Sequence, residues 1–250
     1  PTGDYAMGVT DASKAVNSRV RIRGEVSNKG SEISRGFIQV LSGKKRPHFS
    51  GNSSGRLQLA SWLTSKENPL TARVMVNRVW HHLFGRGIVR TVDNFGETGE
   101  RPSHPGLLDH LAVDFQEDGW SIKRLIRKMV LSRTYRMSSN YSEAHYAVDP
   151  GNEMLWRMRQ KRLDAESLRD SMLAIGGELE LSRPVGSPVM KLPIGEIGKS
   201  ITRAKKTLDG NYRSVYLPIM RSFVPQILQT FDFAEPSMVK GSRDVTTVPT

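Results

Sequence analysis

The chain has 250 residues and a formal net charge of +12, with 37% hydrophobic and 25% charged residues. This composition is typical of a globular protein, and no apolar stretch is long enough to cross a bilayer. The absence of cysteine excludes disulfides, thiolate metal sites and covalent c-type haem attachment within these residues. The positive charge favours polyanionic partners, although a basic solvated surface is the alternative. No common nucleic-acid motif is present, which argues against nucleic acid as the partner.

The first 55 residues are predicted to form a separate strand and loop element. Residues 20–23 alternate apolar and basic side chains, as in a half-exposed strand, and residues 37–41 form a second short apolar run. Residues 42–55 are rich in Ser, Gly, Lys and Pro, which predicts a linker. We therefore expect two parts, an N-terminal element over 1–55 and a helical core domain over 56–250.

From residue 56 the spacing of apolar residues becomes helical. Asn68 is the expected cap of one helix and Gly85 its stop, while Ser103 and Ser121 are the expected caps of two later helices. Residues 138–152 are polar and are predicted to form a loop. The predicted helices span 56–65, 69–84, 105–117, 122–130 and 163–175.

The late part of the chain is predicted to be mostly irregular. Residues 182–211 are rich in Gly, Pro and Lys and are expected to form a mobile loop. Residues 214–220 have strand character, and Pro218 places them at an edge. The predicted fold is thus mainly α, a multi-helix domain with a small β element formed by N-terminal and late strands; an α+β arrangement is the alternative.

Three polar residues at helical spacing of four form the first candidate site. Arg73, Asn77 and His81 share one helix face, with Trp80 beside them. One interpretation is a binding site with a guanidinium for an anion and an imidazole as acid or base. The other is a buried polar network that fixes the helix to its neighbours. The second is favoured because no partner nucleophile or carboxylate lies within sequence reach.

The segment that follows this helix concentrates further candidate ligands. Asp93, Glu97 and His104 lie in a loop rich in glycine and acid, but their spacing matches no calcium-loop motif. The adjacent pair His81 and His82 diverges on a helix, so it cannot form a zinc pair. We therefore predict no metal site. The aromatic residues Trp120, Tyr135 and Trp156 are interpreted as core residues rather than a stacking platform.

Long runs of the sequence resemble a known family. Residues 55–139, from GRLQLASWL to SRTYRMSS, are similar to the planctomycete secreted-protein domain of unknown function, the "PSD-one" type domain of cytochrome-c-associated proteins. Residues 22–37, 155–179 and 213–250 extend the similarity. The resemblance implies an exported multidomain bacterial protein, secreted or in the periplasm or cell envelope, whose relatives continue past residue 250. It places haem in a separate upstream domain, with no cofactor within this segment, and it implies no catalytic residues.

Two functions from different classes are compatible with these observations. The first is a binding or scaffolding domain for an acidic partner or an anionic polysaccharide, acting beside other domains of the parent chain. The alternative is an enzyme domain for carbohydrate or sulfated glycan, with a pocket around Arg73, Asn77, His81 and His104. Salt-sensitive association would favour the first, and convergence of these side chains with an acid in one pocket would favour the second.

Overall fold

The protein is described here by a computed structural model that covers residues 8–42, 49, 53–187, 189, 210–219, 224–238 and 240–243. Contacts within the chain define two compact units. The first comprises Pro1–Val76 and His104–Ile126, and the second comprises Asn77–Ser103 and Arg127–Thr250. Most of the predicted irregular loop 182–211 lies outside the described residues, and the predicted boundary after residue 55 stays a prediction.

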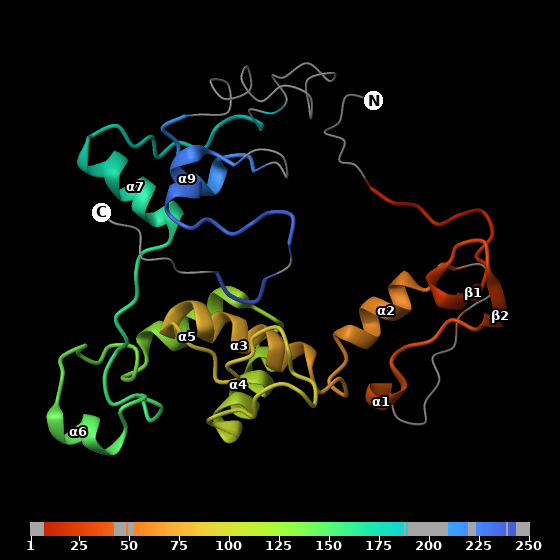
Figure 1. The fold of residues 1–250 in the computed structure, drawn as a ribbon, viewed down its shortest axis with the longest axis horizontal. Coiled ribbons are helices and arrows are strands. Elements are labelled where there is room, and N and C mark those ends of the chain that lie inside the picture. Colours follow the sequence, from red (N-terminus) through yellow and green to blue (C-terminus); the bar gives the residue numbers. More distant parts are fainter. Residues whose placement is uncertain are drawn as a thin grey trace. The chain divides into compact units, whose positions relative to one another are not determined.

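The described part of the chain is mainly helical with one small sheet, which confirms the predicted fold class (Figure 1). None of the helices in the described ranges combines the length and the apolar character needed to cross a membrane. In chain order the elements are β1 (Ser18–Arg21), η1 (Ile22–Gly24), β2 (Lys29–Ile33), α1 (Gln39–Ser42), α2 (Arg56–Leu63), α3 (Thr71–Phe84), α4 (Pro105–Glu117), α5 (Ile122–Leu131), α6 (Glu143–Val148), α7 (Ala165–Ile175), η4 (Ser214–Tyr216) and α9 (Gln226–Thr230).

The small sheet is an antiparallel pair near the N-terminus. β1 pairs with β2 in a register that places Ser18 opposite Ile33. The second predicted strand, 37–41, is wrong, because this segment runs into helix α1. Phe37, the first residue of this segment, stacks on Trp62 of α2 with ring centroids 5.0 Å apart. This tertiary contact overrides the β propensity of the segment.

The predicted late strand is also absent from the described residues. Ser214 opens the 3-10 helix η4 instead of a strand, because its backbone N–H and its hydroxyl both donate to Asp170 Oδ1 of α7. One isolated parallel bridge between Glu180 and Tyr212 is the remnant of strand pairing here. Hydrogen bonds to the distant residue Asp170 thus replace the ladder that the apolar pattern predicted.

The helix-start and helix-stop signals are mostly confirmed. Asn68 Oδ1 accepts hydrogen bonds from the backbone N–H groups of Leu70 and Thr71, at 3.0 and 3.2 Å, and so caps α3. Gly85 ends this helix with a φ of +79°, a conformation that glycine adopts without strain. α4 has the predicted bounds, but its cap position is His104 and not Ser103, whose hydroxyl instead donates to the backbone oxygen of Ile88.

The segment predicted as a polar loop over 138–152 contains an unpredicted helix, α6. Ser142 occupies its cap position, and Trp156 donates from Nε1 to the backbone oxygen of Asp149 at the end of the helix, at 2.9 Å. The six-residue helix is held by these contacts and by aromatic packing rather than by an apolar stripe.

One hydrophobic cluster of the second unit lies between α7, η4 and α9. Figure 1 shows α7 and α9 side by side, and the two helices are in contact. The buried side chains at their interface belong to Ala165, Leu217, Val224 and Leu228, with Ile219, Ile227, Phe231 and Phe233 packed around them. This apolar contact fixes the start of α7, which contributes to the pocket described next.

Candidate functional site

Arg73, on α3, is held by contacts inside the first unit. Its Nε donates to Asp109 Oδ1 of α4 at 2.7 Å, and its Nη1 donates to the backbone oxygen of Pro69 at 2.5 Å. The guanidinium is therefore bonded to oxygens of the protein itself, in line with the favoured interpretation as a structural network. Because both members of the ion pair are partly exposed, it contributes only about 0–1 kcal/mol.

Asn77 and Trp80 are buried parts of the second unit. Asn77 is 0% exposed, and its amide makes two hydrogen bonds with Val89: Nδ2 donates to the backbone oxygen and Oδ1 accepts from the N–H, each at 2.9 Å. Trp80 stacks on Phe84 with ring centroids 3.9 Å apart. The amide of Asn77 thus attaches the segment after α3 to the helix, and the indole of Trp80 packs in the hydrophobic core.

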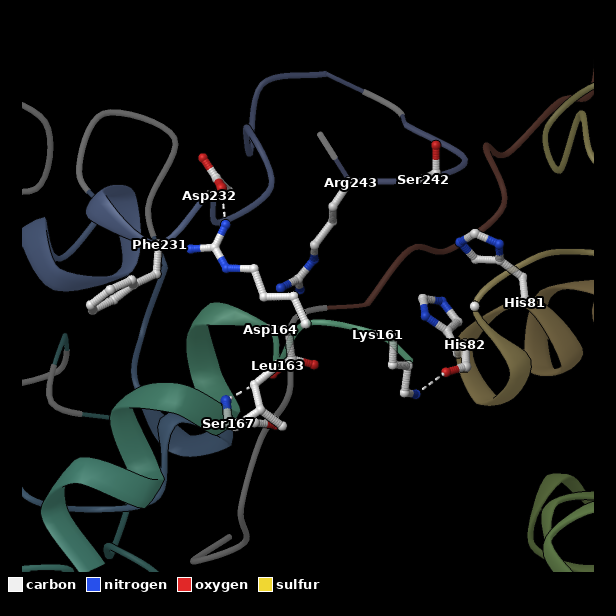
Figure 2. Close-up of a pocket in the computed structure, with 12 residues that line it drawn as sticks. His81, His82, Lys161, Leu163, Asp164, Ser167, Phe231, Asp232, Ser242 and Arg243 are labelled. Carbon is white, nitrogen blue, oxygen red and sulfur yellow. Dashed lines mark hydrogen bonds and ion pairs between the residues drawn. The ribbon is translucent and has the colours of Figure 1, made fainter. Parts of the chain in front are cut away.

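His81 lies in a pocket of about 540 Å³, which we call the histidine pocket (Figure 2). His81 and His82 project into it from the last turn of α3, and the segment leading into α7 lies opposite. Its other lining residues are Gly85, Lys161, Arg162, Leu163, Asp164, Ser167, Phe231, Asp232, Ser242 and Arg243. The pocket therefore collects groups from three distant regions of the sequence, around residues 81–85, 161–167 and 231–243.

The surroundings of His81 favour the neutral imidazole over the protonated one. Burial lowers the pKa of His81, and the positive charges of His82 and Lys161 act in the same direction. Its Nδ1 is buried and has no hydrogen-bond partner among the described residues. A buried ring nitrogen without a partner is uncommon in folded proteins.

Most other ions of the histidine pocket are paired within the protein. Arg162 Nη1 donates to Asp232 at 2.6 Å, and Arg243 makes a two-pronged contact with Glu166 of α7 at 2.5 and 2.7 Å. Burial opposes ionisation of Asp164, but hydrogen bonds from Ser167 and nearby cations outweigh it and hold the pKa of Asp164 below its usual value. These pairs shape the wall of the pocket and offset much of its charge.

A second hollow of about 330 Å³ adjoins the histidine pocket, since Gly85 and Lys161 line both. Among its described lining residues are three cations, Arg157, Arg159 and Lys161, and no carboxylate. The remaining lining residues are Gly85, Pro150, Gly151, Asn152, Met158 and Gln160. We call this the cationic hollow.

The cations of this hollow are fixed by neutral atoms. Arg159 Nη2 donates to the backbone oxygens of Gly151 and Asn152 at 2.6 and 3.0 Å, and Lys161 Nζ donates to the backbone oxygen of His82 at 2.7 Å. The last contact satisfies a carbonyl at the negative end of α3. Carbonyl contacts position these cations without cancelling their charge.

Several other arginines lie close to Arg159. Burial lowers the pKa of Arg159, and the charges of Arg86, Arg90 and Arg157 lower it further, while Asp149 opposes them. An arginine nevertheless remains a cation at neutral pH. The site thus keeps several positive charges close together in a partly dehydrated position, and an anion placed there would relieve the repulsion.

The other predicted site residues lie outside both hollows. His104 belongs to the first unit, at the cap position of α4, and its side chain does not cap the helix. Asp93 is exposed and lies against Gly241, where an added Cβ would come within 2.8 Å of its carboxyl carbon. Glu97 is exposed in a loop that Asn94 closes by accepting the N–H of Gly96. Within the described ranges no group of three or more His, Asp or Glu side chains could hold a metal ion.

The sequence contained one signal for the residues that were missed. Arg157, Arg159, Lys161 and Arg162 occur within six residues, a local concentration of positive charge. Their importance depends on the end of α3 lying beside them, which Lys161 establishes through its bond to His82. Sequence spacing cannot reveal that contact, because the two residues are 79 positions apart.

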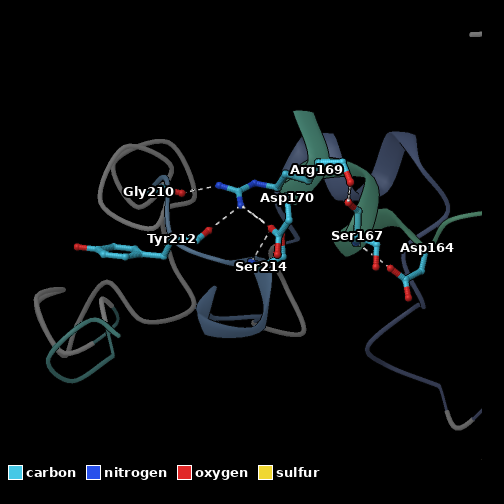
Figure 3. A network of polar contacts seen from close by, with 8 residues as sticks. Asp164, Ser167, Arg169, Asp170, Gly210, Tyr212 and Ser214 are labelled. Atoms are coloured by element: carbon cyan, nitrogen blue, oxygen red, sulfur yellow. Dashed lines mark hydrogen bonds and ion pairs between the residues drawn. The ribbon is translucent and has the colours of Figure 1, made fainter. Parts of the chain in front are cut away.

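A buried polar network supports the helix that borders the histidine pocket (Figure 3). Arg169 of α7 is 7% exposed and donates to the backbone oxygens of Gly210 and Tyr212 and to Ser214 Oγ. Asp170 accepts from Ser214 in turn. Because Arg169 and Asp170 both make these hydrogen bonds, the network joins the segment 210–214 to α7, whose start lines the histidine pocket.

Comparison with known proteins agrees with the resemblance seen in the sequence. No curated protein and no solved structure matches the chain. The PSD1 family model, described as "Protein of unknown function (DUF1553)", matches residues 55–250, which is more than half of the chain. The predicted family is thereby confirmed: the chain belongs to the PSD1 family of proteins of unknown function, and both hollows are built from residues within the matched range.

Proposed function

We propose that the second unit is a binding module for an anionic partner, whose carboxylate, sulfate or phosphate groups occupy the cationic hollow. The observation that carries this proposal is a concave site lined by Arg157, Arg159 and Lys161 with no carboxylate among its described lining residues. Arginine and lysine in such a setting recognise oxyanions through charge-assisted hydrogen bonds.

The adjoining histidine pocket extends the same surface. Lys161 stands between the two hollows, so a ligand longer than one anionic group could pass from one to the other. The side chains of His81, His82 and Asp164 line this part of the surface and could contact such a ligand. An extended anionic polymer therefore suits the site better than a small isolated ion.

The resemblance to exported, cytochrome-associated proteins suggests where such a module would act. We propose that the module acts outside the cytoplasm, beside other domains of a larger protein that include a haem domain. Acidic protein segments and anionic polysaccharides both occur in that setting, and both carry the charge that the cationic hollow selects.

The test is a titration of the chain with polyglutamate, dextran sulfate and uncharged dextran at about 50 mM and about 500 mM salt. We expect binding to at least one of the charged polymers and none to dextran, with affinity falling steeply as salt rises. Equal binding to charged and uncharged dextran, or no binding to either polyanion at low salt, would overturn the proposal.

A second candidate function is an enzyme acting on carbohydrate or sulfated glycan, with His81 as the proton acceptor. It is supported by the neutral, unpartnered imidazole in a pocket that also contains Asp164. Arg73 and Asn77, once grouped with His81, make contacts within the protein instead. Turnover of a sulfated or uronic-acid oligosaccharide that His81→Gln abolishes would establish the enzyme, and its absence in the parent chain would reject it.

A further inference from the structure

An exposed aromatic cluster lies on and around α6, and we call it the aromatic patch. Tyr141 is 54% exposed and Tyr146 is 43% exposed, although their ring centroids are only 5.4 Å apart. Trp156 is 6.5 Å from Tyr141, and the imidazole of His145 stacks on Trp156 at 5.5 Å. Aromatic surface of this kind is usually buried. Its exposure as a cluster on one short segment marks a candidate contact surface.

The rings of the aromatic patch are held in fixed positions. Tyr141 donates its hydroxyl to Glu143 Oε2 at 2.8 Å, and Trp156 donates from Nε1 to the backbone oxygen of Asp149 at 2.9 Å. His145 Nδ1 lies 2.8 Å from Ser142 Oγ. A ligand that contacts these rings would therefore lose little free energy to their ordering.

Arg157 connects the aromatic patch to the cationic hollow. Its guanidinium lies 5.5 Å from the ring centre of Tyr141 and 4.7 Å from that of Trp156. The same residue lines the cationic hollow beside Arg159 and Lys161. Arg157 is thus common to the aromatic patch and the cationic hollow.

We propose that the aromatic patch is a saccharide-stacking subsite and that the ligand of the cationic hollow is an acidic polysaccharide. The proposal rests on the proposed anion-binding function and names its ligand class. A sugar ring presents a face of C–H bonds that packs on tyrosine and tryptophan, hydroxyls at its edge, and, in a uronic acid or sulfated sugar, an anionic group. The exposed rings of Tyr141 and Tyr146 suit the face, and Arg157 with its neighbours suits the anion.

The acidic rim of the aromatic patch favours a saccharide over other polyanions. Glu143, at the hydroxyl of Tyr141, accepts hydrogen bonds from hydroxyl groups, which a sugar ring carries around its edge. The backbone of a single-stranded DNA and the side chains of an acidic peptide offer no such hydroxyl groups at this place. Ring stacking alone would serve a nucleic acid equally well, so the carboxylate is the distinguishing feature.

The experiment is isothermal titration of the chain with four probes: a uronic-acid oligosaccharide, a neutral oligosaccharide of equal length, polyglutamate and oligothymidylate. We expect the uronic-acid oligosaccharide to bind most tightly. Tyr141→Ala should weaken its binding by about threefold to tenfold, as expected for the loss of one ring contact. Tyr141→Phe keeps the ring and should bind like the parent, and Tyr146→Ala tests the second ring independently.

The outcomes separate the two proposals. Unchanged affinity in Tyr141→Ala and Tyr146→Ala, or tighter binding of polyglutamate or oligothymidylate, would overturn the saccharide assignment and leave the anion-binding function standing. No binding of any charged probe would overturn both. Thermal melting of each variant shows whether a lost affinity reflects a lost fold, and polyglutamate binding serves as the second readout of an intact hollow.

Discussion

Replacing Asn77 by alanine is expected to destabilise the protein strongly. Asn77 is fully buried, and its amide is bonded to the backbone N–H and C=O of Val89, itself 2% exposed. Asn77→Ala leaves both backbone groups buried without these partners. Each such group costs about 1–3 kcal/mol, so the sum is about 2–6 kcal/mol. A loss of this size is a large fraction of the free energy of unfolding of a native protein, which is about 5–15 kcal/mol.

The assay is urea denaturation followed by far-UV circular dichroism. The matched control is Asn140→Ala, the same substitution at an exposed position, which should change the free energy of unfolding by less than about 0.5 kcal/mol. His81→Ala should also leave the fold intact, since no described hydrogen bond depends on its buried nitrogen. A loss below about 1 kcal/mol in Asn77→Ala would refute the reasoning, because it would mean that Val89 finds other partners at little cost.

Three further predictions concern stability and pH. Gly87→Ala should destabilise by about 1–3 kcal/mol in the same denaturation assay, since its Cβ would lie 2.3 Å from a backbone oxygen, whereas Gly106→Ala, with open space in α4, should be neutral or stabilising. Arg169→Ala should cost about 3–5 kcal/mol and speed amide hydrogen exchange over residues 210–217; unchanged exchange would contradict the network in Figure 3. Because the pKa of His81 is lowered on folding, the unfolded chain binds the proton more readily: stability is full above about pH 6.5 and falls as the pH drops below that value. Acidification from pH 7.5 to 5.5 should therefore cost the parent more than His81→Gln, and equal losses would refute the shift.

Local signals in the sequence predicted the five longest described helices well, but not the short helices α1, α6 and α9. Asn68, Gly85 and Ser121 act through hydrogen bonds and backbone conformations that reach only a few residues, so their effect can be inferred without a structure. The strands at 37–41 and 214–220 were predicted from apolar runs. Those runs were redirected by contacts with residues far away in the sequence, Trp62 in one case and Asp170 in the other.

The candidate site could be predicted only in part, for the same reason. His81 was identified because it shares one helix face with Arg73 and Asn77 at spacing of four, and the structure places it in a pocket. Arg73 and Asn77 looked equivalent to it in the sequence, yet their partners Asp109 and Val89 sit in other segments. The basic residues within 157–162 could be recognised as part of a site only from the contact of Lys161 with the end of α3.

The most direct test of the anion-binding claim compares two arginine variants in their affinity for dextran sulfate. Arg159→Gln removes a charge that lines the cationic hollow, and Arg127→Gln removes the same charge from an exposed position of α5. We predict that Arg159→Gln weakens binding by about tenfold, the effect of losing one hydrogen bond to a charged group, and that Arg127→Gln changes it by less than about twofold. Equal affinities of the two variants would contradict the account, because the attraction would then come from the net charge and not from the hollow.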